Sequence, residues 1–175
     1  MAELTSPLSL TGERSEVFAS VASYLLHAGF TVVANDFNRP WGGFFVIDES
    51  QAEAFARNYF PDEDFTSLKI SGKLSPKILM VAAGKRLSWQ YHRRRAEIWR
   101  LVAGAAGVVT SDTDEQGSVY ELKIGEVIRL KQGQRHRLVG MSGGWGMIAE
   151  IWQHTDAEHP SDEDDIVRVQ DDFGR

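Results

Sequence analysis

The sequence predicts a mainly β protein, a sandwich or barrel of short strands, and three observations support this fold class. From residue 76 onward, short apolar or alternating runs follow one another, and Gly, Asp or Ser clusters separate many of them. Strands that are joined by turns in this way are typical of all-β folds and not of βαβ units. A chain of 175 residues can bury one sizeable core. Its 42% hydrophobic and 10% aromatic residues are typical of a folded domain.

A helix is predicted before the strands begin, over residues 14–28. Val17, Val21 and Leu25 follow one another at helical spacing, so they would form one apolar face. Gly29 then marks the end of the helix.

A second helix is predicted at 51–59. Ser50 and Glu53 have the spacing of a capping box, and Pro61 ends the run. Between the two helices lies "RPWGGFFVID", residues 39–48, an aromatic stretch interrupted by glycine. It is predicted to be a strand with a bend.

The strand-rich part of the chain begins after the second helix. The expected strands are 77–83, 86–92, 97–104, 107–111, 119–124, 126–131, 136–140 and 145–153. The segment "SDTDEQGS", 111–118, is expected to be an exposed hairpin loop. The acidic tail, 159–175, allows two interpretations: its charge favours a solvated terminus, whereas its apolar residues Ile166, Val167, Val169 and Phe173 favour docking on the domain.

Charge and composition narrow the function classes. The formal net charge of −6 argues against nucleic acid as the main partner. No run approaches the ~20 apolar residues that a membrane span needs, and the first residues do not resemble a signal peptide. With no cysteine, the chain has neither disulfides nor thiolate chemistry, which suits a cytoplasmic protein. Any metal would have to use imidazole, carboxylate or amide ligands.

The segment "SWQYHRRRAEIWRLVAG", 88–104, carries the most informative cluster of polar residues. Gln90 and His92 are two apart, so on a strand they point to the same face. A chain reversal within 93–96 would form a hairpin and bring Glu97 to the same point, while His136 ends another strand. One amide, two imidazoles and one carboxylate make a plausible open site for Zn, Mn, Fe or Co.

Each of these residues also has a structural explanation. A single histidine on a strand is more often a hydrogen-bonded structural residue, and glutamine is an uncommon ligand, so spacing alone leaves the metal site open. The three consecutive arginines could be a solvated turn or a basic patch. The five tryptophans could stack on a sugar, although in a β-barrel they are more often core residues.

Two longer motifs resemble those of the cupin superfamily. The run "GKRLSWQYHRRRAEIWRLVAG", 84–104, resembles the first cupin motif, and "GEVIRLKQGQRH", 125–136, resembles the second. More specifically, "RPWG" (39–42), "RLSWQYHRRRAEIW" (86–99) and "EDDIVRVQDDFGR" (163–175) resemble signatures of the type II mannose-6-phosphate isomerase family. Its members also occur as the carboxy-terminal half of bifunctional enzymes that carry a mannose-1-phosphate guanylyltransferase.

The resemblance implies a cupin double-stranded β-helix, a jelly-roll barrel, over residues 39–175 with a helical insertion near 50–75. Residues 1–38 would be an amino-terminal helical extension that packs on the barrel. The family's site residues map onto the metal ligands Gln90, His92, Glu97 and His136, the catalytic residues Arg95 and Lys77, and the phosphate-binding residues Arg168 and Arg175.

The implied function is metal-dependent interconversion of mannose 6-phosphate and fructose 6-phosphate. One divalent ion is expected, zinc first, with Mn, Co, Fe or Ni as alternatives, and the partner is a small-molecule sugar phosphate; a homodimer is possible. Arg93 and Arg94 stand where the family has histidines, which puts the substrate in question. The alternatives are a non-catalytic sugar- or sugar-phosphate-binding cupin and an iron-dependent oxygenase.

Overall fold

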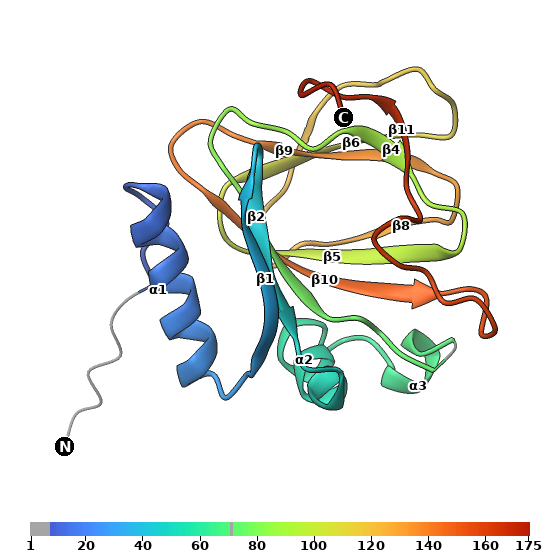
Figure 1. Ribbon diagram of the computed structural model, residues 1–175, viewed down its shortest axis with the longest axis horizontal. Coiled ribbons are helices and arrows are strands. Elements are labelled where there is room, and N and C mark those ends of the chain that lie inside the picture. Colours follow the sequence, from blue (N-terminus) through green and yellow to red (C-terminus); the bar gives the residue numbers. More distant parts are fainter. Residues whose placement is uncertain (1–7, 71) are drawn as a thin grey trace.

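The computed structural model describes residues 8–70 and 72–175 and confirms the mainly β fold. Two antiparallel sheets face each other, and the helices lie outside them (Figure 1). The helices are α1 (Arg14–His27), η1 (Glu49–Gln51), α2 (Ala52–Tyr59) and α3 (Phe65–Leu68). The strands are β1 (Val32–Arg39), β2 (Gly42–Ile47), β3 (Lys77–Val81), β4 (Trp89–Tyr91), β5 (Arg95–Gly104), β6 (Ala106–Ser111), β7 (Tyr120–Glu121), β8 (Val127–Leu130), β9 (Arg135–Gly140), β10 (Gly146–His154) and β11 (Val167–Gln170).

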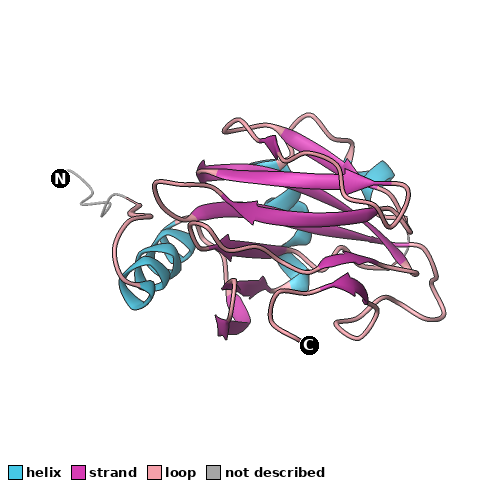
Figure 2. Cartoon of the chain, turned by 90° about the horizontal axis from the view of Figure 1, so that it is seen from above, coloured by secondary structure: helices cyan, strands magenta, loops and turns pink. Residues whose placement is uncertain are grey.

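The strand order is that of a jelly-roll barrel. One sheet has the order β1-β2-β3-β10-β5-β8, and the other has the order β11-β4-β9-β6-β7. Figure 2 shows the strands of the barrel from above, with the helices at its outer side. The consecutive strands β4 and β5 lie in different sheets, as do β9 and β10, so the chain crosses repeatedly between the two walls.

Helix α1 forms as the apolar spacing predicts and ends at His27, one residue before the predicted end. The Glu16 carboxylate accepts a hydrogen bond of 3.1 Å from the backbone N–H of Glu13, which satisfies one free donor at the helix start. Its buried face, with Val17, Val21 and Leu25, packs in the cluster that covers the outer side of the six-stranded sheet.

Three local predictions are wrong. Helix α2 has no Ser50–Glu53 capping box, because residues 49–51 form a 3-10 turn in which the backbone N–H of Ser50 donates to the Asp48 carboxylate. The stretch 39–48 is not one bent strand: β1 and β2 form a hairpin that turns at Pro40 and Trp41. The strand expected at 119–124 is shorter than predicted and covers only Tyr120–Glu121. Neither did the sequence predict β1, which lies in the segment expected to be a helical extension.

The central strands β3, β10 and β5 of the six-stranded sheet are largely buried on both faces, and their alternation sorts the residues between these faces. The outer face belongs to the cluster under the helices, with Ile78, Met80, Ile98, Met147, Ala149 and Ile151. The inner face carries Leu79, Val81, Trp99, Leu101 and Ile148 into the barrel. This period of two is the sheet geometry that places every second side chain on the same side.

Gly42 shows how closely the strands of this sheet approach each other. Its φ of 151° is unusual for other residues, and a Cβ at this position would lie 1.9 Å from the Met80 carbonyl oxygen. The "RPWG" turn therefore requires glycine for the β2–β3 contact. Within residues 8–70 and 72–175, no helix combines the length and apolar character that crossing a bilayer requires.

Candidate metal centre

The predicted ligands converge, but not through the predicted hairpin. Strand β4 pairs with β9 and β11, whereas β5 pairs with β8 and β10 in the opposite sheet. The turn after His92 therefore carries the chain from one sheet to the other. Gln90 faces the barrel interior from one wall and Glu97 faces it from the other, so the hairpin prediction was wrong although its consequence was right.

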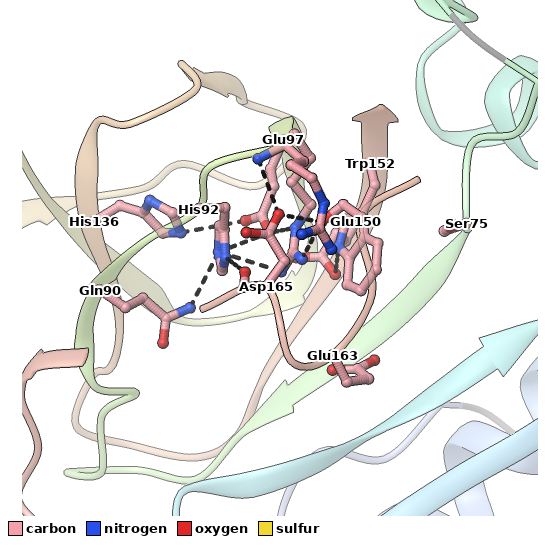
Figure 3. Close-up of polar contacts among 12 residues, drawn as sticks. Ser75, Gln90, His92, Glu97, His136, Glu150, Trp152, Glu163 and Asp165 are labelled. Carbon is pink, nitrogen blue, oxygen red and sulfur yellow. Dashed lines mark hydrogen bonds and ion pairs between the residues drawn. The ribbon is translucent and has the colours of Figure 1, made fainter. Parts of the chain in front are cut away.

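His92, Glu97 and His136 form a compact buried cluster. Three potential ligand atoms, one from each residue, all lie within 4.8 Å of one another. The Nε2 atom of His92 is 3.1 Å from Oε1 of Glu97, and Nε2 of His136 is 3.3 Å from Oε2 of the same carboxylate. Figure 3 shows these side chains directed toward one another.

Backbone carbonyl groups set the orientation of both imidazole rings. Nδ1 of His92 lies 2.6 Å from the Asp165 carbonyl oxygen, and Nδ1 of His136 lies 3.0 Å from that of Gln134. A carbonyl can only accept, so each Nδ1 carries the hydrogen. In the neutral rings, each Nε2 then presents a lone pair to the cluster. This is the tautomer that a metal-ligating histidine adopts.

The electrostatics of the cluster favour a cation at its centre. Burial lowers the pKa of His92 despite the neighbouring Glu97, which favours the neutral ring. Burial alone would raise the pKa of Glu97, but His92 and Arg95 hold it well below its ordinary value. Oε2 of Glu97 and Nε2 of His136 are buried without a hydrogen-bond partner. Lone pairs and a carboxylate directed at one point fit a divalent ion.

Gln90 completes the predicted set from the β4 wall. Its Nε2 lies 3.4 Å from Nε2 of His92, and its Oε1 accepts a 2.5 Å hydrogen bond from the Ser88 hydroxyl. A half-turn of the amide would present the oxygen to the cluster, and the Ser88 hydroxyl would then accept from the amide nitrogen.

Arg95 is a buried residue and not a solvated turn arginine, with 5% of its surface exposed. Its Nε donates a 2.8 Å hydrogen bond to Glu97, and its Nη1 donates to the Ser161 hydroxyl at 2.8 Å. The guanidinium carbon lies 3.6 Å from the centroid of the Trp152 ring. The packing and ion pair fix this cation beside the cluster.

A pocket borders the cluster at Glu97 and extends toward the carboxy-terminal segment. Its lining includes Gln90, Arg95 and Glu97 together with Lys77, Arg39, Arg168 and Arg175. All four predicted catalytic or phosphate-binding residues, Lys77, Arg95, Arg168 and Arg175, thus border one space. Arg39 joins them from the "RPWG" turn, although the sequence analysis gave it no role. Lys77 is buried and ion-paired with Glu163, and its Nζ lies 3.8 Å from the Trp152 ring centroid.

Arg93 and Arg94 do not line this pocket, unlike their neighbour Arg95. Their backbone N–H groups each donate a 3.0 Å hydrogen bond to the carboxylate of Asp165. Arg93 is exposed, and Arg94 lies 3.6 Å from Asp162 at the surface. The turn is therefore held by its backbone, while neither of these two side chains lines the pocket.

Asp165 is a site residue that the sequence reasoning missed. Besides the two turn N–H groups, its carboxylate accepts a 2.6 Å hydrogen bond from the Ser161 hydroxyl. Its carbonyl oxygen accepts from His92, so one residue orients both the turn and a predicted ligand. The tail therefore docks on the barrel, since β11 pairs with β4 immediately after this contact. The available signal was the position of Asp165 inside the "EDDIVR" signature.

Comparison with solved structures identifies the class of this barrel. Oxalate decarboxylase from Bacillus subtilis aligns with a TM-score of 0.52 at 14% identity, over 77% of this chain and 29% of that one. The capsular polysaccharide assembling protein CapF from Staphylococcus aureus aligns with a TM-score of 0.51 at 11% identity, over 89% and 41%. The fold is the cupin double-stranded β-helix that the resemblance implied.

Sequence comparison then identifies the family. Residues 48–171 match the family model "Mannose-6-phosphate isomerase C-terminal", and the chain belongs to this family. The alginate biosynthesis protein AlgA of Pseudomonas aeruginosa is 31% identical over 130 residues, which cover 72% of this chain and 24% of AlgA. The xanthan biosynthesis protein XanB of Xanthomonas campestris is 29% identical over 126 residues, covering 72% and 25%. The chain thus spans about a quarter of the length of these curated relatives.

Proposed function

We propose that this protein is a metal-dependent aldose–ketose isomerase that interconverts mannose 6-phosphate and fructose 6-phosphate. The observation that supports this most strongly is the pocket itself. Glu97 of the buried His92–Glu97–His136 cluster and the neighbouring Gln90 line it together with a set of arginines suited to a phosphate group. Family membership gives the same reaction class, and relatives named for alginate and xanthan biosynthesis suggest a role in supplying polysaccharide precursors.

Gln90, His92, Glu97 and His136 would hold one divalent ion, with zinc as the first candidate. When bound, the ion supplies Lewis-acid stabilisation of the negative charge that builds on the substrate oxygens during isomerisation. The Asp165 carbonyl keeps Nε2 of His92 available to bind, and the Gln134 carbonyl does the same for His136.

The arginines at the carboxy-terminal side of the pocket would bind the phosphate. Burial lowers the pKa of Arg168, and the positive charges of Arg175 and Arg39 add to this effect while Asp171 opposes it, so three cations lie close together. Arg175 is paired with Asp171, and Nε of Arg39 lies 2.9 Å from Asp36. Among the described residues, Arg168 has no carboxylate ion pair. A phosphate would relieve this excess of positive charge through bidentate contacts.

Arg95 would stabilise charge on the reacting end of the sugar from its fixed place beside Glu97. Lys77 lies on the same wall of the pocket, but its contacts with Glu163 and the Trp152 ring are those of a cation. Lys77 therefore fits the role of an electrostatic partner better than that of a neutral base.

A coupled assay tests the proposal. The purified chain, loaded in turn with Zn, Mn and Co, is given mannose 6-phosphate, and the formation of fructose 6-phosphate is followed. The proposal expects turnover that a chelator abolishes and added metal restores. Absence of turnover with every metal, in protein shown to bind the ion, would contradict it.

Two other functions correspond to specific observations. Two histidines and one carboxylate are also the ligand set of non-haem iron oxygenases, and oxygen uptake after iron loading tests that function. Arginines stand at 93 and 94 where the family has histidines, and this departure favours a non-catalytic sugar-phosphate-binding module. Tight sugar-phosphate binding without turnover or oxygen uptake would identify such a module.

A further inference from the structure

Glu150 is a second buried carboxylate in the pocket, in addition to Glu97. It lies in β10, opposite Trp99 of β5 on one side and Lys77 of β3 on the other. Only 4% of its surface is exposed, yet it borders the same pocket as Glu97. Figure 3 shows Glu150 beside Trp152, in the group of side chains that surrounds the cluster.

The hydrogen-bond partners of Glu150 are neutral. Nε1 of Trp99 donates to Oε2 at 2.7 Å, and Nε1 of Trp152 donates to Oε1 at 2.8 Å. Each oxygen retains a lone pair, so the carboxyl group can take up a proton without losing either contact. Among the described residues, no cation forms an ion pair with it: Lys77 is paired with Glu163, and Arg95 with Glu97.

This setting makes both protonation states of Glu150 accessible near neutral pH. Burial is the largest cause that raises its pKa to about 7, and the charge of Glu97 adds to it, while Lys77 and Arg95 act in the opposite direction. A group that carries a proton in catalysis works best when its pKa lies near the working pH.

We propose that Glu150 carries the substrate proton between C2 and C1, an inference that rests on the proposed isomerase function. In the forward direction, its carboxylate removes the C2 hydrogen of the open-chain aldose as a proton. The C–H electron pair forms the C1=C2 double bond, and the carbonyl π pair moves to O1, which gives an enediolate. Glu150 then returns the proton to C1 while the hydroxyl proton on O2 moves to O1, and the C2 carbonyl forms.

The other carboxylate and imidazole groups at the site already have other roles or contacts. Glu97 belongs to the candidate ligand set, as do the two histidines of the cluster. The Glu163 side chain is 56% exposed and pairs with Lys77. Glu150 is the remaining carboxylate in the pocket lining, and it is held rigidly by two indoles. Such fixed positioning is what efficient proton transfer requires.

A purely structural role for Glu150, as the anchor of Trp99 and Trp152, makes an opposite prediction for substitutions. Glu150→Gln keeps the length of the side chain and one acceptor oxygen but cannot carry the proton. Glu150→Asp keeps the carboxylate but shortens the side chain by one methylene. If the role is structural, the Glu150→Gln protein should be at least as active as the Glu150→Asp protein. If Glu150 transfers the proton, the Glu150→Asp protein should be the more active of the two.

The experiment measures turnover, metal content, fructose 6-phosphate affinity and exchange of the substrate C2 hydrogen with deuterated solvent. For Glu150→Gln we expect kcat and exchange to fall about 10²–10⁴-fold, with one ion still bound and affinity changed less than about threefold. Glu150→Asp should be at least about tenfold more active than Gln, on the scale of acid–base contributions. Glu53→Gln, which alters an exposed ion pair with Arg57, is the matched control.

Near-normal turnover of Glu150→Gln, or Gln at or above Asp, would overturn the role of Glu150. If the Glu150→Gln protein does not fold, the activities of Glu150→Asp and Glu150→Asn are compared instead. These two variants also set an acid against an amide, with side chains of equal length. An inactive wild type with bound metal would instead refute the isomerase function, and it would be recognised before any variant is made.

Discussion

The two faces of the six-stranded sheet are both buried, but their contents differ in kind. On β10, Ala149 and Ile151 point outward into the apolar cluster under the helices, while Glu150 and Trp152 point into the barrel. The outer face is continuous hydrocarbon, which stabilises the fold. The inner face combines apolar residues such as Trp99 and Leu79 with charged groups, which cost free energy to bury unless they are paired or bind a ligand. Strand alternation therefore places the candidate site on one face only, although both faces contribute apolar residues to the core.

Removing the central carboxylate should give the largest effect on the inner face. In Glu97→Gln, the metal site loses its negative charge, and Arg95 and His92 lose the charged partner that they contact. We expect turnover to fall more than about 10³-fold, since the Lewis acid and the ion pair that holds Arg95 are lost together. Steady-state kinetics at saturating metal measure this. Activity within tenfold of the wild type would show that the inner face works without this carboxylate.

A large-to-small substitution in the outer cluster should lower stability and leave activity unchanged. Phe55 of α2 is fully buried in the outer cluster. Phe55→Ala should lower the free energy of unfolding by about 3–5 kcal/mol, because it leaves a cavity. The activity of the molecules that remain folded should not change. Denaturant unfolding and metal-saturated kcat, measured on the same preparation, test the separation; a fall in kcat without a loss of stability would contradict it.

Substitution in the arginine group should weaken substrate binding and leave the chemistry in place. For Arg168→Ala we expect KM to rise about 10–100-fold with kcat nearly unchanged, the pattern of lost uniform binding. Inorganic phosphate should inhibit the wild type competitively and inhibit the variant much less. Arg57→Ala, on the exposed side of α2, serves as the control. A lower kcat with unaltered KM would place Arg168 at the reacting end instead.

Asp165 links the inner face to the acidic tail and should give an intermediate effect. Asp165→Ala removes the acceptor for the N–H groups of Arg93 and Arg94, so metal affinity should fall about 10–100-fold, as for other residues that orient ligands. Competition with a chromophoric chelator measures this affinity. Affinity equal to that of the wild type would mean that the turn holds His92 without the carboxylate.

The same residue gives a pH prediction. Burial alone would raise the pKa of Asp165, but Ser161 and the turn N–H groups hold it below its ordinary value. Because its pKa is lower in the folded state, the ionised Asp165 stabilises the fold at pH values above the ordinary pKa of about 3.9. This stability is lost as the pH falls toward the folded pKa. Asp165→Asn should therefore flatten the fall in unfolding free energy between about pH 5 and 3. An unchanged slope would contradict this.

The smallest effect is expected where the sequence departs most visibly from its family. Arg93→His combined with Arg94→His restores the family residues, yet both side chains lie outside the pocket lining. We expect kcat/KM to change by less than about twofold, as for other surface substitutions. A larger gain or loss would show that the turn contacts the substrate after all.

The sequence predicted the fold class from local spacing, whereas the full set of candidate ligands came from the resemblance to a known family. The alternation of apolar residues defines strands, and the two-residue step from Gln90 to His92 places both on one face. The sheet that each strand joins depends on pairing with distant segments, such as β11 with β4. No local signal in residues 93–96 specifies it, and the predicted hairpin was wrong for this reason.

The residues that the sequence analysis missed depend on long-range contacts. The carbonyl of Asp165 reaches His92 across 73 positions of the chain, and Glu150 meets the Trp99 indole across 51. A glutamate in an apolar strand run carries no spacing that would assign it to a pocket. Its role follows only from the burial and the two indole partners that the barrel provides.

The central claim is that the inner face of the barrel holds one divalent ion through Gln90, His92, Glu97 and His136. Its most direct test is the metal content after dialysis against equimolar Zn, Mn, Co, Fe and Ni, measured by atomic emission for the wild type and for His136→Ala. We expect about one ion per wild-type chain and almost none in a folded variant. No bound ion in the wild type, or equal content in both proteins, would contradict it.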